Sequence, residues 1–141
     1  MNTGRNPSDY QAKIDCQWAF EVAFFLQKVG VILRNTGEAL SDQDYQEARE
    51  QAASLEQSAL YEKTLLPDFR TSAYFMESRR LFIHFLDECT NFADLLNLAI
   101  LKREAGSEDF QRRPVQIRES TERLNLLKDM LTSQLHLYGW C

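Results

Sequence analysis

The sequence predicts an all-α fold, a four-helix, up-down-up-down antiparallel bundle with long first and third helices. Apolar residues recur every three or four positions, as on one face of a helix, and no sustained alternation typical of a strand is present. The few glycines and prolines fall between four such stretches, where they can end one helix or begin the next. Short turns between long helices favour antiparallel neighbours.

The first helix is expected from Ser8 to about Arg34. Ser8 and Gln11 have the spacing of a capping box, in which two side chains satisfy free amides of the first turn. Gly37 is expected to end the helix because glycine tolerates a left-handed backbone. The apolar stripe of this helix comprises Ile14, Trp18, Val22, Phe25, Val29 and Ile32.

The second helix is expected to begin at a Ser41 cap, with Asp42 and Asp44 near its positive end, and to reach about Leu65 before Pro67. Small side chains along this helix allow close approach to the bulky faces of its neighbours. Its apolar stripe comprises Tyr45, Ala48, Ala52, Leu55 and Ala59.

The third helix is expected to start at a Thr71 or Ser72 cap and to extend to Glu104, a length on the order of 50 Å. Gly106 and Ser107 would close it.

The fourth helix is expected to open at Pro114, whose ring presets a first helical turn, and to run to Tyr138 before Gly139. Its apolar stripe comprises Ile117, Leu124, Leu127, Leu131 and Leu135. The chain of 141 residues is expected to form a flexible lead over 1–7 and a single helical domain over 8–141.

The negative charge that gives the chain its net charge of −5 is concentrated in the segment from Glu38 to Glu62. This segment contains seven carboxylates and a single basic residue, Arg49. Such a segment repels phosphate, and the arginines near the C-terminus alternate with carboxylates rather than forming a basic stripe. Nucleic-acid binding is therefore not expected. An acidic surface of this kind complements a basic partner.

We expect a cytoplasmic protein without membrane association, because the N-terminus lacks a signal peptide's apolar run and no apolar stretch approaches bilayer length. The three cysteines are far apart, with no spacing typical of zinc ligands. Cys16 and Cys89 are interpreted as small apolar fillers, and Cys141 as an exposed terminal thiol.

Helix three carries more apolar residues than one buried face needs, because fourteen of the twenty-one residues from Leu81 to Leu101 are apolar. Its polar residues form one narrow stripe, which is either the solvent face of a central helix or a groove for a partner. In helix one, Phe24 interrupts the polar line beside Phe25, so one of the two aromatic rings is expected to face outward. This excess apolar surface predicts a homodimer or a partner-bound protein.

Neither a metal nor a cofactor is expected. His84 and Glu88 lie one turn apart, but neither histidine has the carboxylate three residues earlier that di-iron bundles use. A phosphate-cradling glycine loop is also lacking from the sequence.

One enzymatic alternative rests on the segment from Arg79 to His84, which resembles the Arg-x4-His spacing of HEPN-type ribonucleases, themselves small helical bundles and usually dimers. That resemblance implies an arginine on the phosphate and His84 as general acid or base. Arg80, not Arg79, shares the helix face of His84. The acidic chain is a poor ligand for RNA.

The sequence therefore favours a non-enzymatic protein-protein interaction module, such as an adaptor, an inhibitor or immunity-type partner, or a small regulatory subunit. Its partner is expected to be another protein, with a basic protein as the complement of the acidic segment, or a second copy in a homodimer. The candidate contact residues are Phe24, Glu47, Glu50, Arg80, His84 and Asp87.

Overall fold

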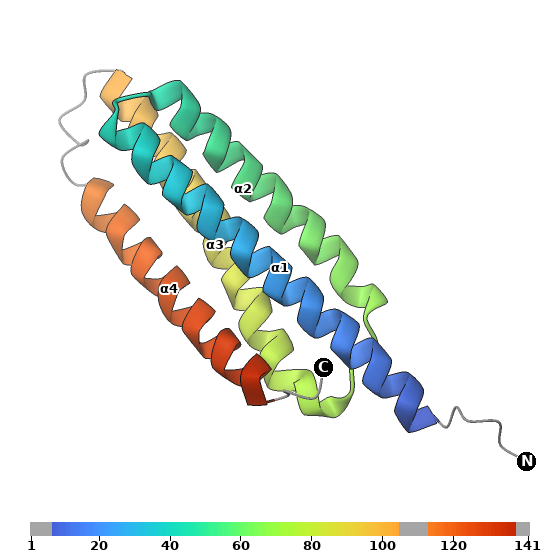
Figure 1. Cartoon of the computed structure of the whole chain (residues 1–141). Helices are drawn as coiled ribbons and strands as arrows, with labels where there is room; N and C mark the ends of the chain where they lie inside the picture. Colours follow the sequence, from blue (N-terminus) through green and yellow to red (C-terminus); the bar gives the residue numbers. More distant parts are fainter. Residues whose placement is uncertain (1–6, 105–112, 138–141) are drawn as a thin grey trace, which may run out of the picture.

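The computed structural model describes residues 7–104 and 113–137, and within these residues the chain forms four α-helices lying side by side (Figure 1). They are α1 (Pro7–Ser41), α2 (Tyr45–Leu65), α3 (Met76–Glu104) and α4 (Arg113–Leu137). Two short 3-10 turns, η1 (Leu66–Asp68) and η2 (Ala73–Phe75), connect α2 to α3. Successive helices run in opposite directions, which confirms the predicted four-helix bundle with long first and third helices.

The four helices do not pack equally. α2 packs against both α1 and α3, and α4 packs mainly against α3, whereas α1 and α4 meet at few residues. A Cβ atom added at Gly30 or Gly37 of α1 would meet nothing within 4 Å outside the backbone of its own helix. The bundle is therefore closed on three sides and loosely closed along the seam between α1 and α4.

Aromatic rings join α1 to η2 and to α3 across the centre of the bundle. Trp18 packs edge-on against Phe75 and Phe82, with ring centroids 5.5 Å and 6.2 Å apart. Phe25 makes the same kind of contact with Phe82 and Phe85, at 5.7 Å and 6.2 Å. Edge-to-face rings of this kind add to the stabilisation from burial alone.

The predicted apolar stripes form the core. In α2 the side chains of Ala48, Ala52, Leu55 and Ala59 are completely buried, which lets α2 approach its neighbours closely. In α4, Leu124 and Leu131 are buried, and the remaining members pack partly buried against the core. Phe25 is buried whereas Phe24 is exposed, as the sequence predicts.

The expected end of the first helix at Gly37 is wrong, because α1 continues to Ser41. Buried Ala39 follows Gly37, and ending the helix earlier would remove this side chain from the core. The turn instead places Gln43 in the left-handed region, with φ 59°. The Asp44 amide donates to the Ala39 carbonyl at 2.8 Å and the Gln43 amide to Leu40 at 3.1 Å, the pattern of a Schellman motif.

Two expected caps are also wrong. Asp44, not Ser41, caps α2, since its side chain accepts a hydrogen bond from the Glu47 amide. Ser8 does not precede the first helical turn, as the expected capping box requires, because α1 already begins at Pro7. The side-chain amide of Gln11 donates to the Asp15 carboxylate and to the Arg70 carbonyl. The Arg70 carbonyl lies 59 residues from Gln11 along the chain, so this partner cannot be read from spacing.

At the connection between α2 and α3, the expected end of the second helix is confirmed and the expected cap of the third helix is corrected. α2 ends at Leu65 and Pro67 lies in the 3-10 turn that follows, as expected. Ser72 precedes η2 without a side-chain cap, and its backbone amide donates to Asp15 of α1 at 2.8 Å. The expected breaks at Gly106, Ser107, Tyr138 and Gly139 lie outside the described residues.

Candidate functional site

The six candidate contact residues do not form one surface. Phe24 lies on the outward face of α1, Glu47 and Glu50 lie on α2, and the other three lie on α3. Since α1 and α3 are diagonal in the bundle, their outward faces look in opposite directions (Figure 1). Any single partner surface therefore includes only a subset of them.

The polar stripe of α3 is a solvent face. Its exposed members include Arg80, His84, Asp87, Asn91 and Asp94. Arg80 pairs with Glu77 one turn earlier at 2.5 Å, and Asp87 pairs with Lys63 of α2. The hydrogen bond from Arg80 lowers the pKa of the exposed Glu77 carboxyl.

Hydrogen bonds to the connection between α2 and α3 hold the side chain of Arg79. Its guanidinium donates to the carbonyls of Phe69 and Leu66 and, at 2.9 Å, to the Thr71 hydroxyl. These bonds fasten the α2–α3 connection to α3. They use three of the five guanidinium N–H groups, so Arg79 has a structural role that the Arg-x4-His spacing does not indicate.

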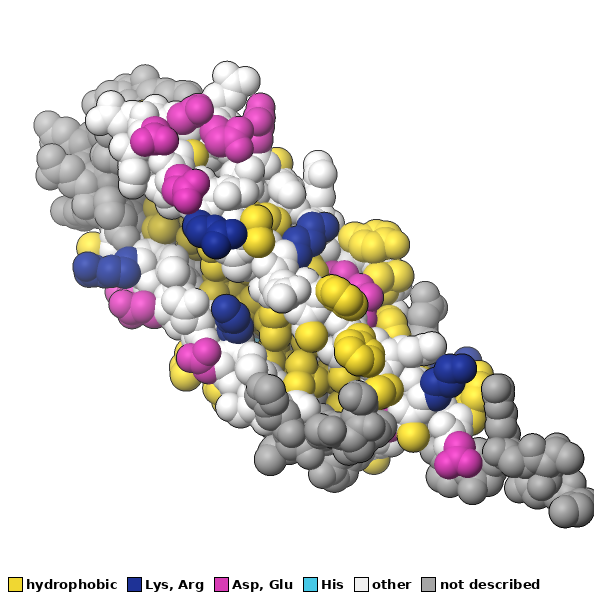
Figure 2. Space-filling view, in the orientation of Figure 1, with side chains coloured by type: hydrophobic (Ala, Val, Ile, Leu, Met, Phe, Trp, Pro, Cys, Tyr) yellow, Lys and Arg dark blue, Asp and Glu magenta, His cyan; other side chains and the backbone are white. Residues whose placement is uncertain are grey.

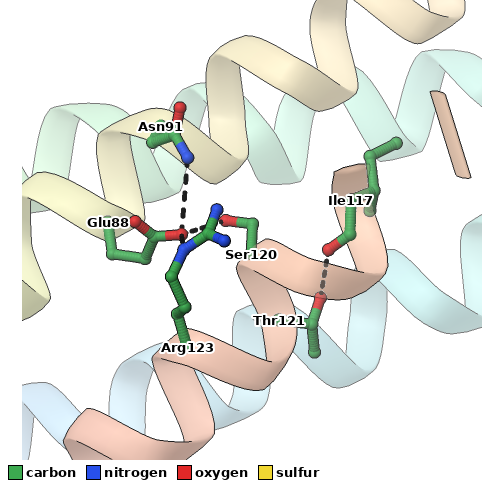
Figure 3. Close-up of polar contacts among 6 residues, drawn as sticks. All are labelled: Glu88, Asn91, Ile117, Ser120, Thr121 and Arg123. Atoms are coloured by element: carbon green, nitrogen blue, oxygen red, sulfur yellow. Dashed lines mark hydrogen bonds and ion pairs between the residues drawn. The ribbon is translucent and has the colours of Figure 1, made fainter. Parts of the chain in front are cut away.

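Glu88 departs from the polar stripe and faces α4 (Figure 3). One carboxylate oxygen accepts from the Ser120 hydroxyl and from the Arg123 guanidinium, each at 2.7 Å, and from the Asn91 amide at 3.4 Å. The Glu88 side chain is 15% exposed and Ser120 is fully buried, so this cluster is a polar clamp between α3 and α4. Sequence periodicity placed Glu88 on the solvent face of the third helix, so it did not predict this contact with α4.

A pair of carboxyl groups lies between α1 and α2. Glu62 of α2 is 8% exposed and shares a hydrogen bond with Glu21 of α1. The pKa of Glu62 is raised to about 8, mainly by desolvation and also by the hydrogen bond and the charge of Glu21, while Lys28 partly opposes the rise. The pair holds a proton near neutral pH.

The described residues contain no group of three or more histidine, cysteine or acidic side chains that could hold a metal ion. Cys89 is buried and its thiol is free, and burial raises its pKa well above the ordinary range. Cys16 is disulfide-bonded, so its interpretation as a simple apolar filler is wrong. Cys141 lies outside the described residues.

The outward face of α1 carries large apolar side chains. Phe20, Phe24 and Val31 are 54%, 66% and 46% exposed, and spacings of four and seven residues place them on one face of the helix. We call these three residues the α1 ridge. Figure 2 shows apolar side chains gathered along α1 and in the seam toward α4. The sequence indicated Phe24 alone, because periodicity does not distinguish the positions of Phe20 and Val31 from partly buried ones.

This apolar character gives α1, from Asp9 to Ser41, a window long and apolar enough to cross a membrane by length and composition. The expectation that no stretch approaches that length is therefore corrected. Because 39% of the window is buried inside the bundle, part of its apolar content belongs to the core. Core helices of soluble proteins pass the same test.

Carboxylates gather at the end of the bundle where α1 turns into α2, as the upper end of Figure 2 shows. The exposed members, which we call the acidic end, are Glu38, Asp42, Asp44 and Glu50. The last turn of α1 contains no basic residue.

No family model, curated protein or solved structure matches the chain.

Proposed function

We propose that the protein is a non-enzymatic interaction module that binds a partner protein through the α1 ridge. The observation that supports this proposal is the outward exposure of Phe20, Phe24 and Val31 along a single helix. Exposed aromatic side chains that are aligned, rather than scattered, are typical of protein interfaces.

The acidic end defines the chemistry of the partner. A partner with basic side chains beside an apolar helical face would be steered by the carboxylates and held by the ridge. A second copy of the chain carries the same net charge of −5, so dimerisation would bring like charges together. We therefore favour a basic partner over the homodimer, which remains the competing occupant.

A photo-crosslinking amino acid placed at position 24 tests the proposal in the source cells. The matched control carries the same group at position 98, because Leu98 is an exposed apolar residue of α3, on the opposite side of the bundle. We expect one discrete protein adduct at position 24 and none at position 98. An adduct of twice the chain mass would instead identify the homodimer.

The partner, once identified and purified, is then titrated against the wild type and two variants. Phe24→Ser is expected to weaken binding by about 30-fold, the scale of an aromatic hot spot, and Leu98→Ser to leave it unchanged. Added salt should slow association, because it screens the acidic end. Equal effects of the two substitutions would contradict the proposal.

A further inference from the structure

A pocket of about 470 Å³ lies at the end of the bundle where the seam between α1 and α4 opens. Leu40 of α1 contributes to one wall, and Ile117 of α4 to another. Leu96, Ala99 and Ile100 of α3 line it as well, and each is almost completely buried. Its volume falls within the range of small-molecule sites, roughly 300–1,000 Å³.

The packing of the helices explains why this space exists. α1 and α4 meet at few residues, and a Cβ atom added at Gly37, one turn before Leu40, would meet nothing within 4 Å outside the backbone of its own helix. Ala99 of α3 is too small to fill the gap. An apolar wall without partner atoms loses dispersion contacts, and a bound hydrocarbon would restore them.

Few polar groups line the pocket, and they limit the chemical class of ligand that can bind. Arg118 is the charged residue of the lining, it is exposed, and it has no carboxylate partner among the described residues. The Thr121 hydroxyl donates to the Ile117 carbonyl at 2.9 Å and is left as an acceptor. Tyr45 of α2 also lines the pocket and carries a phenol. The pocket therefore combines a mainly apolar interior with two hydroxyl groups and one cation, Arg118.

We propose that this pocket binds a free, single-chain anionic amphiphile of the fatty-acid class. The hydrocarbon tail would lie against Leu96, Ala99 and Ile100, and the carboxylate would pair with Arg118. The carboxylates of the acidic end contribute no atom to the lining. They would repel the ligand's carboxylate only weakly, because dissolved salt screens charges at that separation. This site is separate from the α1 ridge.

Calorimetric titration of the full chain with decanoate and dodecanoate, both below their micellar concentrations, tests the proposal. We expect saturable one-to-one binding that strengthens about fourfold with each methylene, the gain from burying one such group. Dodecan-1-ol has the same tail without the charge. It should bind about fivefold more weakly than dodecanoate, on the scale of an exposed ion pair.

Two substitutions locate the ligand. Arg118→Gln should reduce the affinity for dodecanoate to that for dodecan-1-ol, and leave the alcohol unaffected. Lys128→Gln, an equal loss of charge at an exposed position of α4 outside the lining, should change neither. Ala99→Leu places a larger side chain in the space of the hydrocarbon tail and should weaken the binding of both ligands.

Three results would overturn the proposal. The first is uptake of dodecanoate that does not saturate at one equivalent. The second is equal weakening by Arg118→Gln and Lys128→Gln, which would indicate a non-specific charge effect. The third is unchanged binding by a folded Ala99→Leu variant. If Ala99→Leu fails to fold, the comparison of Arg118→Gln with Lys128→Gln still tests the proposed site. Phe24→Ser should leave dodecanoate binding intact, whatever its effect on binding of the partner protein.

Discussion

Replacing Glu62 by glutamine should remove a pH-dependent loss of stability. In the folded protein the pKa of Glu62 is about 8, against an ordinary value of 4.5. Between these values the folded chain binds more protons at this site than the unfolded chain, so stability decreases as pH rises. At about 1.4 kcal/mol for each pKa unit, the complete loss is about 5 kcal/mol, of which roughly 2.5 kcal/mol falls between about pH 6 and about pH 9.

Glutamine has the shape of a protonated glutamate and can donate a hydrogen bond to Glu21 without titrating. The Glu62→Gln variant should therefore gain stability relative to the wild type steadily over this pH range. Urea unfolding followed by circular dichroism at constant ionic strength measures the difference. Glu50→Gln, an exposed position on the same helix, is the control and should follow the wild type. Parallel profiles for the wild type and Glu62→Gln would refute the reasoning, because the pair would then hold no proton that depends on folding.

Three other predictions concern the turn, the clamp and the buried thiol. Gln43→Gly should stabilise the protein by about 0.5–1 kcal/mol in thermal unfolding, because glycine adopts the left-handed backbone at φ 59° without a steric cost; a drop in Tm would contradict this. Glu88→Ala should cost about 1–3 kcal/mol in urea unfolding, since the buried Ser120 hydroxyl loses its acceptor, and Asp94→Ala on the solvent face of α3 should cost far less. Cys89 should resist iodoacetamide in the native protein and react after unfolding, because burial keeps its thiol protonated and covered; rapid native labelling at Cys89, located by peptide mapping, would disprove it.

The sequence predicted those features that depend on local periodicity. The alanines of α2 and the leucines of α4 recur every three or four residues, so their helical faces and burial follow from spacing alone. The end of α2 at Leu65 was also predictable, because Pro67 cannot continue a helix. These signals lie within a few residues of the feature that they determine.

The candidate site was less predictable. Phe24 was identified from its break in a polar line, but Phe20 and Val31 occupy positions that periodicity alone does not distinguish from partly buried ones. Arg79 had the spacing of a catalytic residue, and only its bonds to the α2–α3 connection indicate a structural role. Those bonds span ten residues or more and leave no local pattern.

The sequence by itself determined the four helices, their apolar faces and the acidic segment from Glu38 to Glu62. The tertiary structure decided where α1 ends, which carboxylates share a proton, and that α1 stays apart from α4. Each of these depends on the distance between helices, because Glu62 is desolvated only when α1 covers it and the pocket exists only where the seam remains open. Periodicity defines the faces of a helix, and the packing of those faces sets how far apart the helices lie.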